Sequence, residues 1–266
     1  MVERKQGRRS AQQAEETKQH ILLFATQMFC EQGYERVSLR SISEKAGVSH
    51  SLIRHHFGSK EKIWHAISDG LHDYMQRYIA HILEKLPPDT QANVKLYTLV
   101  SRLLAFMLTY PQPIQLIADA VRQEDALFDY FIDNVGELES QVFAIAEEYN
   151  TLFPETPVNV AELKWQMIMV AHSAASLTPF MRQTWVDESL NDVECLARQW
   201  QMFERHVASV LHIEQENRLT TVTVDDLVYD VPCFTQEQGG DCAFEQQLNQ
   251  LNRVFGCMHG ADAETQ

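Results

Sequence analysis

Apolar side chains recur at helical spacing through most of residues 14–212, and the breaks between these runs contain glycine or proline. The first run places Ile21, Ala25 and Met28 at i, i+4 and i+7, which is the spacing of one face of an α-helix. Glycine and proline number only 10 and 8 in 266 residues, a composition that favours long helices over a turn-rich β fold. The pattern therefore predicts an all-α chain.

Capping residues and helix breakers give the bounds of the expected helices. Ser38, Ser49 and Ser59 each stand before an apolar run, where a hydroxyl accepts a hydrogen bond from the first helical turn. Prolines separate the later runs. The predicted helices cover residues 14–32, 38–45, 49–56, 60–85, 90–109, 113–123, 126–150, 160–182 and 188–212.

The last 53 residues, 214–266, have a different pattern and predict a short mixed extension. The stretch LTTVTVDDLVYDV at 219–231 alternates β-branched residues around two aspartates, which predicts a short hairpin. Beyond Gly239-Gly240, apolar residues from Phe244 to Phe255 return to helical spacing. Nothing in the pattern indicates what this extension does.

Charge divides the chain into a basic end and an acidic body. Residues 1–66 contain 11 Lys and Arg against 7 Asp and Glu, a net charge of +4. The remainder has 22 − 11 = 11 basic and 37 − 7 = 30 acidic residues, a net charge of −19, which gives the whole chain its net charge of −15. This asymmetry suggests a polyanion-binding module joined to a body that avoids polyanions, although chance variation along the chain remains an alternative.

The basic end has the pattern of a helix-turn-helix. Ala46-Gly47 supplies a small, flexible turn between the second and third predicted helices, and Val48 supplies an apolar plug for the angle between them. Base edges in the major groove are recognised by hydrogen-bonding side chains. The outward face of the third helix is expected to offer such groups, namely Ser49, His50, Ser51, Arg54 and His55.

On these residues the chain resembles the tetracycline-repressor (TetR) family of bacterial regulators over positions 15–65. The resemblance is carried by Gly33-Tyr34, Ser38–Ile42 (SLRSI), Ala46–Ser49, His56-Phe57 and Ser59–Glu61. One position departs from the family, because Arg54 stands where a phosphate-contacting tyrosine is usual. The forked guanidinium of arginine also binds phosphate, so DNA binding is expected in spite of this departure.

The resemblance implies a division of the chain and a set of DNA contacts. We expect a basic arm at 1–14, a DNA-binding domain at 15–62, a helical effector-binding and dimerisation domain at 63–213, and the extension at 214–266. Ser38 and Lys60, at helix N-termini, are expected on phosphates, and Arg40 on a base or a phosphate. The start of the third helix, from Ser49 through His50 and Ser51 to Leu52, is expected on base edges, with Arg54 and His55 beside it.

The histidines at the end of the third helix and the basic arm each have a simpler structural interpretation. His55 and its neighbour His56 are also compatible with local packing, without any role in DNA recognition. The arm residues Arg4, Lys5, Arg8 and Arg9 suit a neighbouring minor groove, but a solvated leader explains them equally well.

Two copies of one short recognition helix give a longer site, so we expect a homodimer on an inverted-repeat operator of double-stranded DNA. Small residues at 171–176 and an apolar stripe from Val193 to Leu211 predict a dimer surface, unless the stripe is buried within its own subunit.

The resemblance also implies a small-molecule effector site. Its candidates are Phe106, Tyr110, Trp165, Met169, His172 and Phe180, with Arg102 and Arg122 as charged anchors, although a methionine or aromatic residue at helical spacing usually belongs to the core.

Other functions lack support in the sequence. There is no catalytic triad order, phosphate-binding glycine loop or metal-binding motif, so we expect no enzyme, no cofactor and no metal site. Cys233, Cys242 and Cys257 have spacings that match no usual zinc site. No stretch is apolar enough for a membrane span, and no secretory signal is evident, so a cytoplasmic protein is expected. The favoured hypothesis is a ligand-released repressor; the alternative is a DNA-bound structural or interaction factor with the same fold.

Overall fold

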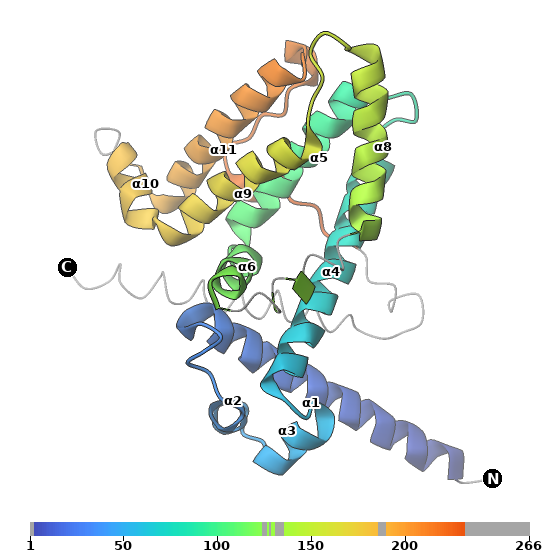
Figure 1. Ribbon diagram of the computed structural model, residues 1–266, viewed down its shortest axis with the longest axis vertical. Coiled ribbons are helices and arrows are strands. Elements are labelled where there is room, and N and C mark those ends of the chain that lie inside the picture. Colours follow the sequence, from blue (N-terminus) through green and yellow to red (C-terminus); the bar gives the residue numbers. More distant parts are fainter. Residues whose placement is uncertain (1–2, 124–126, 128, 131–135, 186–189, 232–266) are drawn as a thin grey trace. The chain divides into compact units, whose positions relative to one another are not determined.

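The computed structural model describes residues 3–123, 127, 129–130, 136–185 and 190–231 (Figure 1). The described residues are helical, with no strand among them, and the predicted all-α class is confirmed. They group into two compact units. Unit 1 comprises the chain up to His72 together with the described residues between Asp119 and Tyr130, and unit 2 comprises residues 73–118 and the described residues from 136 to 231.

Unit 1 is built from α1 (Glu3–Gln32), α2 (Leu39–Ala46), α3 (His50–His56), the first part of α4 (Lys60–Glu84) and the end of α6 (Gln112–Gln123). One apolar face of each helix meets in a common core, as the helical spacing of the sequence requires. The core consists of fully buried side chains, namely Ile21, Ala25, Phe29, Ile42, Ile53, Ile63 and Trp64.

Unit 2 is organised around α5 (Ala92–Thr109), against which α8 (Gly136–Leu152), α9 (Val160–Ser176) and α11 (Asp192–Val210) pack. α10 (Thr178–Thr184) packs on α9 and α11. The core includes Tyr78, Leu96, Tyr97, Phe106, Tyr149, Trp200 and Val207. Within the core, the indole N–H of Trp200 donates to the Ser101 carbonyl at 2.8 Å, so the ring is held on α5 by a hydrogen bond as well as by packing.

The last described residues, 214–231, form a C-terminal strap that lies on α5 and α11. The strap contains two short 3-10 helices, η2 (Gln215–Asn217) and η3 (Val224–Leu227), and η3 packs against both α5 and α11. The hairpin predicted at 219–231 is therefore wrong. In a 3-10 turn, residues three apart share a face, and here this places Val224 and Leu227 together in the core, an outcome that the alternating pattern did not anticipate.

Most helix predictions agree with the structure, although some of the bounds differ. α1 begins at Glu3, well before the predicted start at residue 14. The helix expected at 160–182 is broken at Leu177, because Pro179 has no N–H to continue the hydrogen-bond ladder of α9. The helix expected after Gly239 lies outside the described residues. None of the helices in the described ranges is both long and apolar enough to cross a membrane.

Candidate nucleic-acid interface

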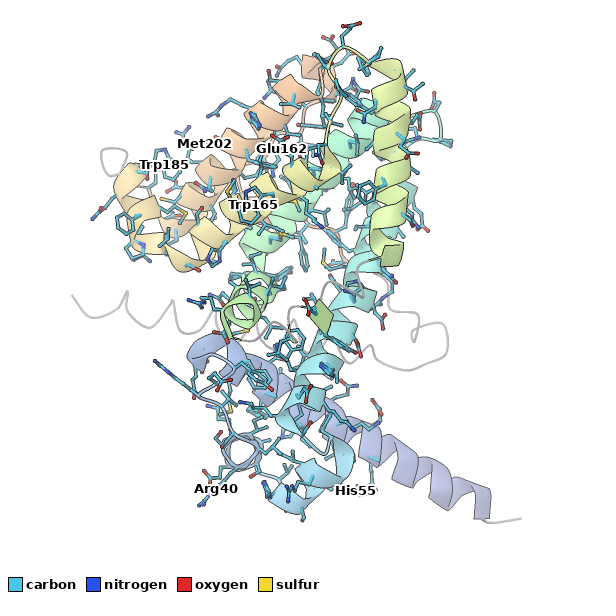
Figure 2. The ribbon with its side chains drawn as sticks, viewed as in Figure 1. Arg40, His55, Glu162, Trp165, Trp185 and Met202 are labelled. Carbon is cyan, nitrogen blue, oxygen red and sulfur yellow. The ribbon has the colours of Figure 1, made fainter. Side chains whose placement is uncertain are left out.

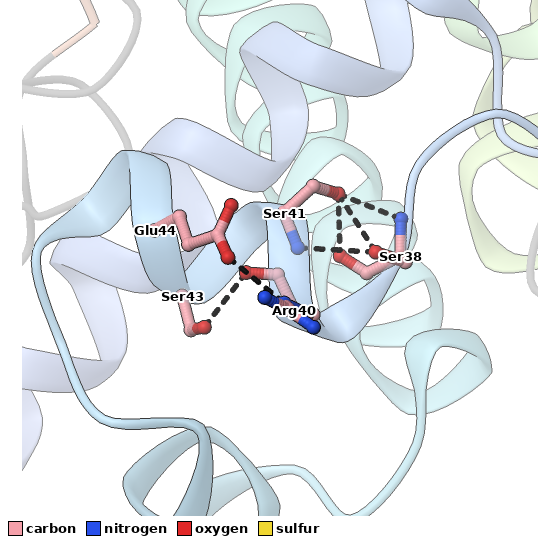
Figure 3. A network of polar contacts seen from close by, with 5 residues as sticks. All are labelled: Ser38, Arg40, Ser41, Ser43 and Glu44. Atoms are coloured by element: carbon pink, nitrogen blue, oxygen red, sulfur yellow. Dashed lines mark hydrogen bonds and ion pairs between the residues drawn. The ribbon is translucent and has the colours of Figure 1, made fainter.

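The N-terminus of α2 is fixed by a reciprocal pair of serine hydrogen bonds (Figure 3). The Ser38 hydroxyl accepts from the Ser41 backbone N–H at 3.0 Å, and the Ser41 hydroxyl accepts from the Ser38 backbone N–H at 2.9 Å. This capping box satisfies two backbone donors and holds the first turn in place. Ser38 is thus where the sequence predicted it, at an exposed helix N-terminus suited to an anion.

The turn between α2 and α3 depends on Gly47. Its backbone has φ +66°, a left-handed conformation that glycine adopts without steric cost, and Val48 N–H returns to the Ser43 carbonyl at 3.0 Å. A ring nitrogen of His20 on α1 lies 2.9 Å from the Ala46 carbonyl, which ties the end of α2 to α1. These contacts set the angle between the two helices of the motif.

α3 presents one polar face to solvent and one apolar residue to the core. Ser49 caps it by accepting from the Leu52 backbone N–H at 3.2 Å, and Ile53 is fully buried. The side chains of His50, Ser51, Arg54 and His55 are exposed, and Leu52 is half-buried. Within unit 1, Figure 2 shows His55 on α3 and Arg40 on α2 projecting from the same end. This surface, formed by Ser38, Arg40 and the exposed residues of α3, is called the recognition surface below.

Arg40 and Lys60 already have partners within unit 1. The guanidinium of exposed Arg40 pairs with the Glu44 carboxylate at 2.9 Å, one helical turn away (Figure 3). The ammonium of Lys60 donates to the Tyr34 carbonyl at 3.0 Å and lies 3.9 Å from the centre of the Tyr34 ring. Since an ammonium group carries three donors, a further contact of Lys60 with phosphate remains compatible with this position.

The contact between the end of α6 and the α1–α2 turn was not indicated by any sequence pattern. The Asp119 carboxylate accepts from the Tyr34 backbone N–H at 2.5 Å, and it also pairs with Arg122 at 3.6 Å. Gly33, at φ +83°, brings the backbone close to this carboxylate. The 85 residues between Asp119 and Tyr34 place the contact beyond any local sequence signal.

His56 differs from its neighbours on α3 because it is half-buried rather than exposed. Partial burial, followed by the nearby His55 and Lys18, lowers the pKa of His56 below its ordinary value. The neutral form is therefore favoured. The structure accordingly gives His56 a local packing environment, with its ring tilted against that of Phe57.

The residues predicted for an effector site do not all lie together. In unit 2, Arg102, Phe106 and Tyr110 line one side of α5, and the rings of Phe106 and Tyr110 are in edge contact. Trp165, Met169 and Phe180 are exposed, the first and last by 60% and 68%, so within one chain they do not enclose a ligand. His172 is half-buried and lies 3.3 Å from the Ser176 hydroxyl. Arg122 belongs to unit 1.

The capped α2, the glycine turn and the exposed α3 define unit 1 as a helix-turn-helix DNA-binding domain. Residues 21–67 match the family model described as bacterial regulatory proteins, tetR family. The match is limited to the N-terminal region, which is therefore similar to the DNA-binding region of this family.

Two curated relatives extend this finding. The chain is 36% identical over 66 residues to the HTH-type transcriptional regulator TtgR of Pseudomonas putida, which covers 25% of this chain and 31% of that protein. It is 40% identical over 61 residues to the HTH-type transcriptional regulator AcrR of Shigella flexneri, which covers 23% and 28% of the two chains. The chain thus spans about a third of the length of these relatives, and the likeness concerns the DNA-binding region.

Solved structures share the fold over a larger part of the chain. The transcriptional regulator FadR from Bacillus subtilis, solved in complex with stearoyl-CoA, has a TM-score of 0.50 at 16% identity and covers 73% of this chain and 95% of that one. The fatty acid degradation regulator FadR from Bacillus halodurans has a TM-score of 0.50 at 15% identity, with 75% and 96% covered. At such identities the likeness is one of fold, namely a helix-turn-helix domain followed by a helical domain.

Proposed function

We propose that the protein is a homodimeric transcription regulator, a repressor that binds an inverted-repeat operator and leaves it when a small-molecule effector binds. The observation that carries this proposal is the recognition surface. It presents hydroxyl, imidazole and guanidinium groups to solvent from a short, capped helix. Such groups are the donors and acceptors that recognise base edges and phosphates. Binding to bacterial operator DNA also implies a cytoplasmic location.

Individual roles follow from position on α2 and α3. His50 and Ser51, in the first turn of α3, are assigned to base edges together with Ser49 and Leu52. Arg54, exposed one turn further along, is assigned to a phosphate, because a guanidinium forms paired hydrogen bonds with phosphate oxygens. The exposed N-terminus of α2 at Ser38 supports a second phosphate contact.

The test is selection of bound sequences from a random DNA pool, followed by affinity measurements on the enriched sequence. We expect an inverted repeat. His50→Ala and Arg54→Ala should each weaken binding by roughly 5- to 150-fold, the equivalent of about 1–3 kcal/mol for a good contact. Only the Arg54 variant should also reduce the salt dependence of affinity. Arg205→Ala, an exposed arginine of unit 2, is the charge-matched control and should bind as the unaltered protein does.

Binding to DNA without enrichment of any sequence would instead favour the alternative, a DNA-bound structural factor. Loss of affinity in Arg205→Ala equal to that in Arg54→Ala would show that net charge, and not the recognition surface, governs binding.

The proposed dimer surface differs from the one expected from the sequence. Most of the apolar stripe of α11 is buried within its own subunit, where Ala197, Trp200, Phe203 and Val207 pack toward the core. The stripe is therefore an internal face, because it covers α5. The expectation that it forms the subunit interface is wrong for these residues.

A different apolar surface stays exposed along the seam between α9 and α11. Gln166 is within 3.1 Å of His206, and Gln199 donates to the Ser173 hydroxyl at 3.1 Å. These two cross-links fix the register of the helices, so that Met169 and Met202 lie between them along the seam. Both methionines are exposed, as is Trp165 one turn before Met169; Figure 2 shows Trp165 and Met202 on the two helices. We propose that a second copy of the chain covers this seam.

The subunit association is tested by sedimentation equilibrium on Met202→Glu. An unpaired carboxylate buried in an interface costs several kcal/mol, so dissociation should become easier by at least about tenfold. Phe143→Glu, on the exposed side of α8, is the matched control, because it places the same charge on an exposed apolar residue away from the seam. Equal dissociation of both variants would place the interface elsewhere.

A further inference from the structure

The C-terminal strap is anchored to unit 2 at its first half by a buried polar network. The guanidinium of Arg218 makes two hydrogen bonds to the Glu204 carboxylate of α11, at 2.9 and 2.7 Å. The Tyr97 hydroxyl of α5 donates to the same carboxylate at 2.7 Å and accepts from the Leu219 backbone N–H at 2.7 Å. The strap therefore begins from a fixed point between α5 and α11.

The second half of the strap ends on Arg102 of α5. One guanidinium nitrogen of Arg102 donates to the Leu227 carbonyl at 2.5 Å, and the guanidinium carbon lies 3.9 Å from the centre of the Tyr229 ring. The Nε of Arg102 is buried and has no hydrogen-bond acceptor. No carboxylate in the described ranges forms an ion pair with Arg102. A half-buried guanidinium with one buried, unpaired N–H gains from an anionic partner, because charge-assisted pairs are stronger than bonds to neutral carbonyls.

Aromatic side chains surround the place where the strap meets Arg102. Phe106 and Tyr78 are fully buried with ring centres 4.9 Å apart, and Tyr74 stacks on Phe106 at 5.5 Å. The Tyr229 backbone N–H donates to the Tyr78 hydroxyl at 3.4 Å, and the His81 ring contacts the Tyr229 ring edge-on at 5.7 Å. Burial raises the pKa of Tyr78 to about 12, so this phenol is a neutral hydroxyl at physiological pH. The side chains around Arg102 are thus mainly aromatic, and they include the hydroxyl of Tyr78.

Resting on the effector-responsive function proposed above, we propose that Arg102 is the anchor for an aromatic monocarboxylate, and that Tyr229 of the strap occupies this site in the absence of the ligand. The strap offers Arg102 an oxygen acceptor at Leu227 and an aromatic face at Tyr229. An aromatic carboxylate carries both groups in one molecule, and its oxygen acceptor is negatively charged, whereas the Leu227 carbonyl is neutral. Two parallel hydrogen bonds from the guanidinium to the carboxylate then replace the single bond to a carbonyl.

This arrangement makes the strap a competitor of the ligand. Because Arg218 and Glu204 hold its first half, the second half, which carries Tyr229, remains close to Arg102 even when it is displaced. The stacking of an arginine on a tyrosine ring corresponds to a factor of about 2 to 30 in an equilibrium constant. Removing the ring should therefore raise ligand affinity by a factor in this range.

The experiment uses the full chain and 3-(4-hydroxyphenyl)propionate, whose ring and carboxylate reproduce the groups that meet Arg102. Titration calorimetry compares the unaltered protein with Tyr229→Ala, Tyr229→Phe and Arg102→Gln. The neutral amide of the same compound measures the contribution of charge. Val222→Ala, an exposed position of the strap, is the matched control for alteration of this segment.

We expect Tyr229→Ala to bind the acid about 2- to 30-fold more tightly than the unaltered protein, with Tyr229→Phe and Val222→Ala unchanged. Arg102→Gln should weaken binding at least tenfold, and the amide should bind every form at least tenfold more weakly than the acid. Arg102→Lys keeps the positive charge but not the forked guanidinium, so its affinity for the acid should lie between those of the unaltered protein and Arg102→Gln. This intermediate affinity would show that Arg102→Gln loses the anchor and not the fold.

Equal binding of acid and amide, equal binding by Tyr229→Ala and Val222→Ala, or no binding to Tyr229→Ala would each overturn the inference. Operator affinity of the same variants, measured without the compound, separates this result from the wider proposal. A protein that binds its operator but not the acid would reject the Arg102 site alone, whereas absence of specific DNA binding would reject the proposed function itself.

Discussion

The recognition surface of unit 1 and the strap of unit 2 are both rich in polar side chains, but they differ in exposure. His50, Arg54 and His55 of the recognition surface are exposed to solvent. In unit 2, Arg218 of the strap is largely covered, and its partner Glu204 on α11 is only 5% exposed. Polar side chains of the recognition surface are therefore expected to contribute mainly to binding, and those around the strap mainly to stability. Substitutions in the two regions should change different measured quantities.

The largest expected effect on stability is that of Glu204→Ala. This change removes the carboxylate that serves both Arg218 and the Tyr97 hydroxyl, leaving a largely covered guanidinium and a buried phenol without their acceptor. Removal of one partner from a buried pair costs about 3 kcal/mol or more. Because the Arg218 side chain remains 24% exposed and regains some hydration, we expect a loss of about 2–3 kcal/mol in urea unfolding.

Arg182→Ala is the matched control for this prediction. Arg182 also makes two hydrogen bonds to one carboxylate, that of Asp192, but the two side chains are 55% and 41% exposed. A solvent-exposed pair contributes about 1 kcal/mol or less. Similar losses of unfolding free energy in Glu204→Ala and Arg182→Ala would show that burial does not determine how much these ion pairs contribute to stability.

A smaller effect is expected from Gly33→Ala in unit 1. Gly33 has φ +83°, and a Cβ atom there would lie 3.1 Å from a carboxylate oxygen of Asp119. Gly47, at φ +66°, has open space at the corresponding position. A left-handed non-glycine residue costs about 1 kcal/mol, so we expect that loss for Gly47→Ala and about 2 kcal/mol for Gly33→Ala, where crowding adds to it.

Thermal unfolding of the two alanine variants measures this difference. The same two substitutions are then made in the Asp119→Ala variant, which lacks the carboxylate that crowds Gly33. With the carboxylate absent, Gly33→Ala should cost no more than Gly47→Ala. If the gap between the two glycines persists without Asp119, the crowding is not its cause.

The smallest expected effect is a pH dependence due to His56. Since its pKa is lowered in the folded protein, the folded state binds fewer protons than the unfolded state, and stability increases with pH. The contribution is complete above the ordinary pKa of 6.5 and is lost as the pH falls from there through the lower folded value. Thermal midpoints between pH 7.5 and 5.5 should fall more for the unaltered protein than for His56→Gln. Parallel curves would remove His56 as the cause.

The recognition surface was predictable because its signals are local. Ser38 and Ser49 cap the helices that follow them, and Gly47 occupies the left-handed turn, each within a few residues of the backbone group that it serves. Short sequence patterns predict local hydrogen bonds and local backbone conformations, because the residues involved are close together in the chain. The bounds of α2 and α3 accordingly agree with the prediction to within a residue.

Contacts between distant residues were not predictable in this way. Helical spacing shows that Trp200 belongs to an apolar face, but it does not show whether α5 or a second copy covers that face. The contacts of Asp119 with Tyr34 and of Arg102 with Tyr229 join residues 85 and 127 positions apart, where 229 − 102 = 127. Each depends on packing of helices that a single-sequence pattern does not specify.

The placement of the four tryptophans gives the protein its own optical probes. Trp64 in unit 1 and Trp200 in unit 2 are each only 1% exposed, whereas Trp165 is 60% exposed and Trp185 is half-buried. Indoles shielded from water emit at shorter wavelengths than hydrated ones. Variants that retain a single buried tryptophan would therefore report, through a red shift in fluorescence, the melting of one unit independently of the other, and Trp165 alone would report the covering of the α9–α11 seam.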